Sequence, residues 1–169
     1  MDAERPAETA GATETMSAIR LSAPGTPDAL ALEQIEVPRA GPGEALVRVH
    51  AAAITRDELE WPVDRLPAIP SYEVSGTVEA VGPGVEKLAS GDEVFALTPF
   101  DRDGNAAELA LVPAAVLAKK PRSLDHVESA ALPMGGLSAW QALFDHGRLR
   151  RGERVIVTGA TGGVGHLEA

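Results

Sequence analysis

Short runs of alternating apolar and polar residues fill the chain over residues 19–121, and turns rich in glycine and proline separate them. The clearest run is 45–54, in which apolar side chains alternate with Arg48 and His50. Further runs lie at 73–81, 93–97 and 107–112. Alternation of this kind is typical of strands that bury one face, so we predict a small, irregular, partly open β-barrel.

The hydrophobic period changes near Ser123. Residues 124–132 predict a short helix and residues 137–146 a longer one. The longer helix should end at Gly147, because glycine readily adopts the left-handed conformation that closes many helices. Beyond it, the apolar residues of 154–158 predict a short strand. The predicted fold class is therefore α+β, with a β-rich barrel followed by helices and one further strand.

A glycine-rich turn ends that last strand, since residues 155–165 read VIVTGATGGVG. Dinucleotide-binding βαβ units begin in this way, because glycine permits the tight turn, the approach of backbone N–H groups to a pyrophosphate, and the packing of helix on strand. The residues expected to bind a cofactor are Gly159, Gly162, Gly163, Val164 and Gly165. A βαβ unit needs roughly 30 residues or more, so the rest of this unit is expected to be absent. In the alternative interpretation, the glycines only form a turn.

Composition narrows the class of protein. The chain has 169 residues, 44% of them hydrophobic and 4% aromatic, which is enough for one domain with a mainly aliphatic core. Its net charge of −10 argues against nucleic-acid and anionic-membrane partners. It has no cysteine and no apolar run near the roughly 20 residues that span a bilayer, so a cytoplasmic protein is expected. Residues 1–16 lack periodicity and are expected to be a disordered tail, with Met16 as an alternative start.

Five sequence blocks, in order, resemble the medium-chain dehydrogenase/reductase family, in particular its zinc-free quinone oxidoreductase-like branch. They are GEALVRVHAAAI (43–54), IPSYEVSGTVEAVGPGV (69–85), GDEVFAL (91–97), SAALPMGGLSAWQAL (129–143) and RRGERVIVTGATGGVG (150–165). The resemblance implies a GroES-like catalytic domain over 17–132. It also implies a connecting helix and the start of a Rossmann dinucleotide-binding domain over 133–169, C-terminally truncated.

The same resemblance implies an NAD(P)H-dependent oxidoreductase that acts on a small-molecule carbonyl, enone or quinone, with NADPH in preference to NAD. Full-length relatives are expected to be homodimers, whereas this chain alone is expected to be inactive and able to self-associate through its unpaired strand. Two other hypotheses stay open, namely a non-catalytic GroES-like binding module and an inactive truncation product.

A rival family shares the glycine pattern. Residues 158–165 also fit the TGxxxGxG motif that opens short-chain dehydrogenases. In that family the motif lies close to the N-terminus, whereas a β-rich region precedes it in this chain. Position therefore favours the medium-chain family.

The residues at the family's zinc positions argue against a metal. Zinc-dependent relatives have a cysteine after the AAAI-type strand, where this chain reads Thr55-Arg56-Asp57-Glu58. Their histidine is replaced by Tyr72 in Ser71-Tyr72-Glu73. The four histidines of the chain are His50, His126, His146 and His166, which lie in unrelated segments without a ligand spacing and are interpreted as surface or turn residues. No zinc is therefore expected.

Without a metal, hydrogen-bond donors must polarise the carbonyl of a substrate. By resemblance, Thr55 stands where relatives have an asparagine that faces the nicotinamide, and Ser138 replaces a threonine that contacts it. Tyr72 places a phenol near the position that the metal occupies in relatives, which makes it a catalytic candidate. In the alternative interpretation, Tyr72 is a half-buried strand residue. Trp61 is interpreted as packing and Glu73 as a buried structural carboxylate. Arginines near the second helix end are expected to face solvent, and they are Arg148, Arg150, Arg151 and Arg154.

Overall fold

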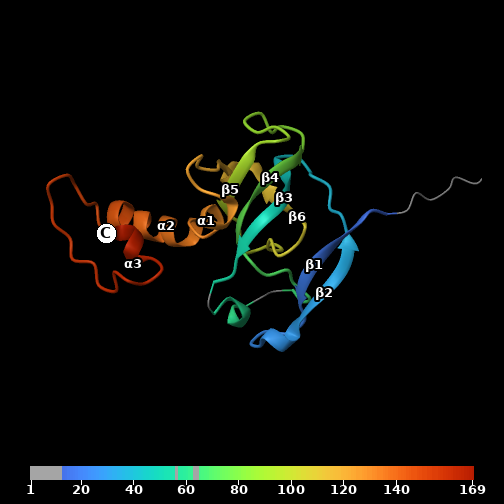
Figure 1. Ribbon diagram of the computed structural model, residues 1–169, viewed down its shortest axis with the longest axis horizontal. Coiled ribbons are helices and arrows are strands. Elements are labelled where there is room, and N and C mark those ends of the chain that lie inside the picture. The colour runs from blue at the N-terminus through green and yellow to red at the C-terminus, as the bar shows by residue number, and fades with distance from the viewer. Residues whose placement is uncertain (1–12, 56, 63–64) are drawn as a thin grey trace, which may run out of the picture.

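The computed structural model describes residues 13–55, 57–62 and 65–169 of the chain. Its main sheet has five antiparallel strands in the order β6-β3-β4-β5-β7 (Figure 1). These strands are β3 (Glu44–Ala53), β4 (Glu73–Val81), β5 (Glu93–Leu97), β6 (Leu109–Pro113) and β7 (Ala118–Lys119). The first three confirm the predicted runs, and β6 begins at residue 109 in place of the expected 107.

A second, two-stranded sheet pairs β1 (Thr15–Leu21) with β2 (Leu30–Glu36). Single bridges join it to the rest of the chain, from Ala18 to Ala107 and from Leu21 to Ala68, so the two sheets form the predicted partly open barrel. The expected tail boundary at residue 16 is wrong, because Met16 lies in β1 and is only 4% exposed. Its side chain packs in an apolar cluster, which orders this end of the tail. Residues 1–12 of the expected tail lie outside the described residues.

The core of the barrel is aliphatic, as the composition predicted. Its most deeply buried valines come from four strands and are Val47, Val74, Val78, Val94 and Val112. They occupy inward-facing positions of the alternating runs, where a branched side chain packs well on a pleated surface. Two register shifts between β3 and β4 make the barrel irregular.

Short helical turns and three α-helices complete the described chain. The single turns are η1 (Pro27–Ala29), η2 (Glu58–Glu60) and η3 (Ala114–Val116). Helix α1 (His126–Ala130) begins with a capping box, in which the Asp125 side chain accepts from the Glu128 N–H and the Glu128 side chain accepts from the Asp125 N–H. Helix α2 (Pro133–Trp140) starts four residues before the expected 137 and continues as a π-helical segment, η4 (Gln141–His146). No helix of the described residues is long and apolar enough to cross a membrane.

The end of the second helix differs from the prediction. Gly147 has a φ of −71°, and the left-handed residue is Arg148, with a φ of 52°. Glycine is required at 147 for another reason, because a Cβ there would lie 2.7 Å from the carbonyl oxygen of Ala142. The helix therefore ends at Gly147, where its own backbone comes too close to leave room for a side chain.

The predicted strand at 154–158 is not formed. Ile156 is 91% exposed and Val155 is 49% exposed, and no described strand lies beside them to complete backbone hydrogen bonds. The glycine turn does form, with Gly159 at a φ of 73° and the Gly162 N–H donating to the Gly159 carbonyl at 2.8 Å. The last helix, α3 (Gly165–Glu168), follows it.

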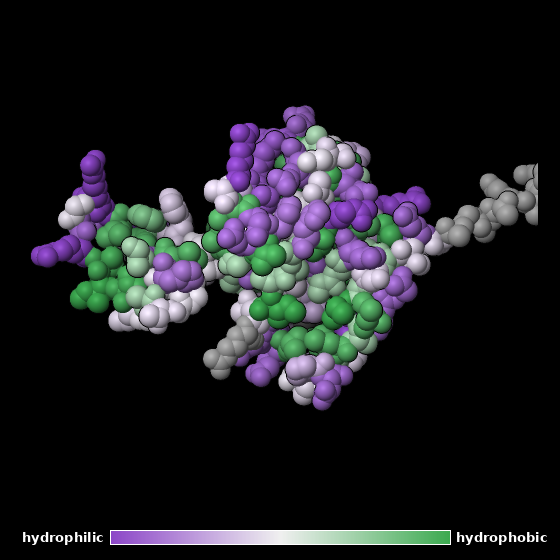
Figure 2. Space-filling model, in the orientation of Figure 1, coloured by the Kyte–Doolittle hydropathy of each residue, from purple (hydrophilic) through white to green (hydrophobic). Residues whose placement is uncertain are grey.

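One apolar face lies on the segment that extends away from the barrel (Figures 1 and 2). Its exposed large side chains are Leu137, Trp140, Phe144, Val155, Ile156 and Val164. The rings of Trp140 and Phe144 contact each other, with centroids 4.6 Å apart. Exposed apolar side chains gathered in this way favour association with other surfaces.

We therefore expect the chain to self-associate through this face. The double substitution Trp140→Gln/Ile156→Ser removes the two most exposed members and should shift the weight-average mass in sedimentation velocity from oligomers toward the monomer. Val127→Ser is the matched control, because Val127 is 70% exposed but lies on α1, away from this face. A wild-type chain that stays monomeric at every concentration would rule the association out.

Candidate functional site

Tyr72 lies directly before β4 and directly after Ser71, whose backbone conformation is tightly held. Ser71 has a φ of 74°, a left-handed conformation that is uncommon for a residue with a side chain. Several hydrogen bonds hold it there: its hydroxyl donates to the Ala53 carbonyl at 2.9 Å, and the Asn105 amide donates to its carbonyl at 2.9 Å. Both Ser71 and Asn105 are buried. These bonds hold the backbone of Ser71 and so fix the orientation of the next residue, Tyr72.

Three aromatic rings meet at Tyr72. Its centroid lies 5.0 Å from that of Phe100 and 6.2 Å from that of Trp61, and the Trp61 and Phe100 centroids are 5.5 Å apart. A hollow of about 30 Å³ lies among them and is also lined by Glu58. Trp61 thus packs as expected and lines this hollow. Phe100 was missed by the sequence analysis, since it lies in an irregular loop after β5 and has no pattern around it.

The phenol of Tyr72 stays protonated. Burial is the main cause that raises its pKa, the carboxylates Glu58 and Asp103 also raise it, and Arg65 opposes them. A neutral phenol is a hydrogen-bond donor, which is the property a carbonyl-polarising group needs.

Glu58 joins Thr55 to Ser71, the residue before Tyr72. Its carboxylate is 5% exposed and accepts hydrogen bonds from the Ser71 N–H and, at 3.0 Å, from the Thr55 N–H. Burial raises its pKa, and the two backbone bonds oppose that shift. The role of Glu58 is not visible in the sequence, because only the folded chain brings residues 55 and 71 to the same carboxylate.

Glu73 is a buried carboxylate, as predicted, and it connects the barrel to α2. One of its oxygens accepts a hydrogen bond of 2.9 Å from the N–H of Met134, in the first turn of that helix. The Thr55 side chain also hydrogen-bonds to it. Burial is the main cause that raises the pKa of Glu73, and Glu58 raises it further.

Replacing Glu73 with glutamine tests this burial. Glutamine can keep the bond to the Met134 N–H and cannot ionise. The folded-state pKa of Glu73 is raised, so its contribution to stability is present below the ordinary pKa of 4.5 and is lost as the pH rises through the folded-state value. The free energy of unfolding of Glu73→Gln should therefore increase relative to wild type as the pH rises above 4.5 in denaturant titrations. Glu60→Gln, at an exposed position, should show no such trend. If the free energy of unfolding of Glu73→Gln relative to wild type does not change with pH, Glu73 does not have the raised pKa of a buried carboxylate.

The expected cofactor residues lie against the same helix. A Cβ on Gly135 of α2 would lie 2.9 Å from the Gly163 carbonyl, so the glycine turn touches this helix. Ser138 is half-buried and follows Met134 by about one helical turn. The glycine turn thus meets α2 in its first turn, at Gly135, and Ser138 lies about one turn further along the helix. Thr55 is connected to this first turn through Glu73, whereas Tyr72 packs against Trp61 and Phe100.

These residues do not complete a dinucleotide site by themselves. A phosphate site of this type uses free N–H groups at the start of a helix. Here α3 has four residues, and the N–H groups of Gly162, His166 and Leu167 donate within the turn. Open space lies above Gly163, where a Cβ would meet nothing within 4 Å. The described residues therefore provide only part of a phosphate-binding site.

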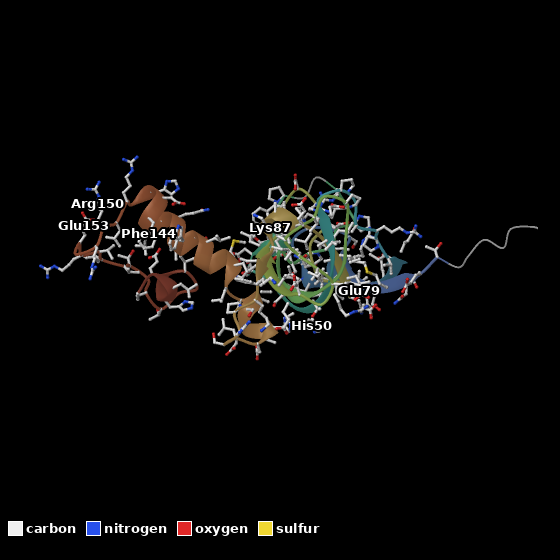
Figure 3. The ribbon with its side chains drawn as sticks, turned by 90° about the horizontal axis from the view of Figure 1, so that it is seen from above. His50, Glu79, Lys87, Phe144, Arg150 and Glu153 are labelled. Carbon is white, nitrogen blue, oxygen red and sulfur yellow. The ribbon has the colours of Figure 1, made fainter. Side chains whose placement is uncertain are left out.

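The remaining polar candidates are separate from this site. Among the described residues, no group of three or more His, Cys, Asp or Glu side chains could hold a metal ion. The expected solvent-facing arginines are all exposed, and Figure 3 shows Arg150 at the far end of the molecule beside Glu153. His50 is exposed, in agreement with its interpretation as a surface residue, and it stacks on the partly buried His126 with centroids 4.4 Å apart, a contact that the sequence did not indicate.

Comparison with known proteins agrees with this arrangement. Residues 41–122 match the alcohol dehydrogenase GroES-like domain. The chain is 34% identical over 164 residues to a probable zinc-binding mitochondrial oxidoreductase of Arthroderma benhamiae, with 90% of this chain and 49% of that protein covered. It is 36% identical to a quinone oxidoreductase of Rattus norvegicus, with 89% and 47% covered.

A solved structure shows the same fold. The alcohol dehydrogenase superfamily protein of Novosphingobium aromaticivorans superposes with a TM-score of 0.85 at 34% identity, over 91% of this chain and 49% of that one. The chain spans about half the length of the curated relatives it matches.

Proposed function

The chain carries the GroES-like domain of the medium-chain dehydrogenase/reductase family, and from this premise we propose that it supplies the substrate-side half of an oxidoreductase. The proposed enzyme is NAD(P)H-dependent and zinc-independent and reduces a quinone or enone. NADPH is proposed in preference to NAD, and a homodimer in the cytoplasm is proposed for the whole protein. The quinone oxidoreductase relative supports the substrate class.

One observation carries this proposal, namely that α2 links the two groups of candidate residues. Its first turn is held at Met134 by Glu73, which also bonds the Thr55 side chain and follows Tyr72 in the chain, and Gly135 of the same turn contacts the glycine turn. Hydride transfer needs reacting atoms about 3–3.5 Å apart, so acceptor and cofactor sites must be held at a fixed separation. A single helical turn in contact with both groups supports that requirement.

The chemistry proposed for this chain is polarisation of the acceptor without a metal. A carbonyl gains negative charge on its oxygen as it is reduced, and positioned donors stabilise that charge. Tyr72 offers a neutral phenol, and Thr55 a hydroxyl that would turn from Glu73 to the acceptor. The aromatic rings of Trp61 and Phe100 beside Tyr72 favour a planar, conjugated acceptor.

A fusion protein tests the proposal. It joins residues 1–165 of this chain to the remaining part of the rat quinone oxidoreductase, which completes the dinucleotide site. We expect it to oxidise NADPH in the presence of a quinone, measured by the loss of NADPH absorbance. The 169-residue chain alone should neither bind NADPH in a fluorescence titration nor show turnover. A folded fusion protein that binds NADPH but does not reduce quinones or enones would favour the non-catalytic binding module.

A further inference from the structure

Three strands of the barrel contact the imidazole of His126, the first residue of α1. Its Nδ1 lies 2.8 Å from the Ser75 hydroxyl on β4, and its Nε2 lies 3.3 Å from a carboxylate oxygen of Glu93 on β5. Its face stacks on His50 of β3, with 14° between the ring planes. Figure 3 shows His50 beside the turn of chain that carries α1. A single ring therefore fixes the start of this helix on the sheet.

Hydrogen bonding at this ring can adapt to one added proton. Glu93 accepts a hydrogen bond from Nε2–H, so the neutral ring has a bare Nδ1 that accepts from the Ser75 hydroxyl. When Nδ1 is protonated, it donates to the Ser75 oxygen, and the hydroxyl proton turns to the Val94 carbonyl at 3.1 Å. Ser75 is fully buried and keeps a partner in both states. His126 is therefore built to titrate without leaving a buried polar group unpaired.

The stacked pair cannot hold two protons. Two imidazolium rings at a centroid separation of 4.4 Å repel, whereas one charged ring stacks well on a neutral one. The charged and titratable groups that face the pair are Glu93, which favours a charged His126, and Lys120, which opposes it and lies 3.6 Å from Glu93. The other contacts are hydroxyls, from Ser75 and, 3.0 Å from His50, from Thr77. Burial is the main cause that lowers the pKa of His126, in agreement with the geometry.

The position of α1 controls that of α2. Only Ala131 and Leu132 separate the two helices, and the Met134 N–H donates to Glu73 of the barrel. Lys120 fixes the turn before α1, since its ammonium donates to the Leu124 carbonyl at 2.7 Å. Release of His126 would free a segment that has few other polar contacts to the sheet.

We propose that the His50–His126 stack is a pH-sensitive latch that holds the connecting helices on the barrel. The latch is closed while the pair carries at most one proton. The second proton separates the rings, so that α1 loses its contact with β3, and it loosens the bond between Met134 and Glu73. The barrel and the glycine turn then lose their fixed relative position in acid.

Histidine titration and amide hydrogen exchange by NMR on the full 169-residue chain test the latch. The two ring Cε1–H signals should titrate in two separate steps, and protection of the Ser129, Ala130 and Met134 amides should fall about tenfold or more once the second proton binds, after correction for the intrinsic pH dependence of exchange. His50→Phe keeps a stacked ring that cannot be charged. It should merge the titration into one step and retain protection in acid.

A second variant separates the latch from a general acid effect. His146→Gln removes an exposed histidine outside the pair and should leave both titration steps and the acid loss of protection unchanged. The proposal is wrong if His50 and His126 titrate independently, or if His50→Phe loses the same amide protection in acid as the wild-type chain does.

Discussion

Replacing Tyr72 with phenylalanine is expected to lower kcat of the fusion protein by about a hundredfold, in line with the loss of one oriented donor at a developing oxyanion. The phenol is neutral near pH 7 at its ordinary pKa of 10.0, and burial raises that pKa further, so the substitution removes a donor and no charge. Packing should change little, since phenylalanine keeps the ring between Trp61 and Phe100. Steady-state NADPH oxidation with a quinone measures the effect.

A matched substitution distinguishes donation from packing. Phe100→Leu alters the same ring cluster but removes no polar group, so it should raise KM and leave kcat within a few-fold of wild type. Thermal unfolding should be similar for both variants. If Tyr72→Phe keeps full kcat, Tyr72 is a packing residue before β4 and the catalytic assignment is wrong.

Replacing Gly76 with alanine is expected to destabilise the barrel by about 3 kcal/mol or more, as overpacking does in a core that cannot move. A Cβ at 76 would lie 2.1 Å from the Arg48 carbonyl and 2.9 Å from a methyl carbon of Val47, both on β3. Relief would require β3 and β4 to separate, which breaks the central ladder of the sheet. Denaturant unfolding followed by circular dichroism measures the change.

Gly136→Ala is the control, and its expected sign is opposite. Gly136 lies inside α2, and a Cβ there would meet nothing within 4 Å. Alanine has the higher helix propensity, so this variant should be stabilised by up to about 1 kcal/mol. Equal effects at the two glycines would contradict the close approach of β3 and β4.

The barrel could be predicted because each of its strands buries one face. The alternation in 45–54 reports burial directly, and β3 follows it to within a residue at each end. The strand predicted at 154–158 failed for the opposite reason. A run such as Val155 and Ile156 records only that the segment is apolar, and a strand forms only when neighbours pair with its backbone.

The sequence indicated candidate residues for the site but not the contacts that connect them. The positions of Thr55 and Tyr72 followed from the order of the sequence blocks. The carboxylate of Glu58, which bonds the backbone at residues 55 and 71, depends on contacts between distant segments. The stack of His50 on His126 is of the same kind, because 76 positions separate the two residues in the chain. Local patterns carry no signal for such pairs.

The most direct test of the account is the turnover of the fusion protein with NADPH and a quinone before and after treatment with a zinc chelator. The central claim is that donors of this chain, Tyr72 and Thr55, polarise the acceptor without a metal. We expect measurable NADPH oxidation that the chelator does not change, in protein whose zinc content by elemental analysis is far below one ion per chain. Turnover that the chelator abolishes and added zinc restores would contradict the account.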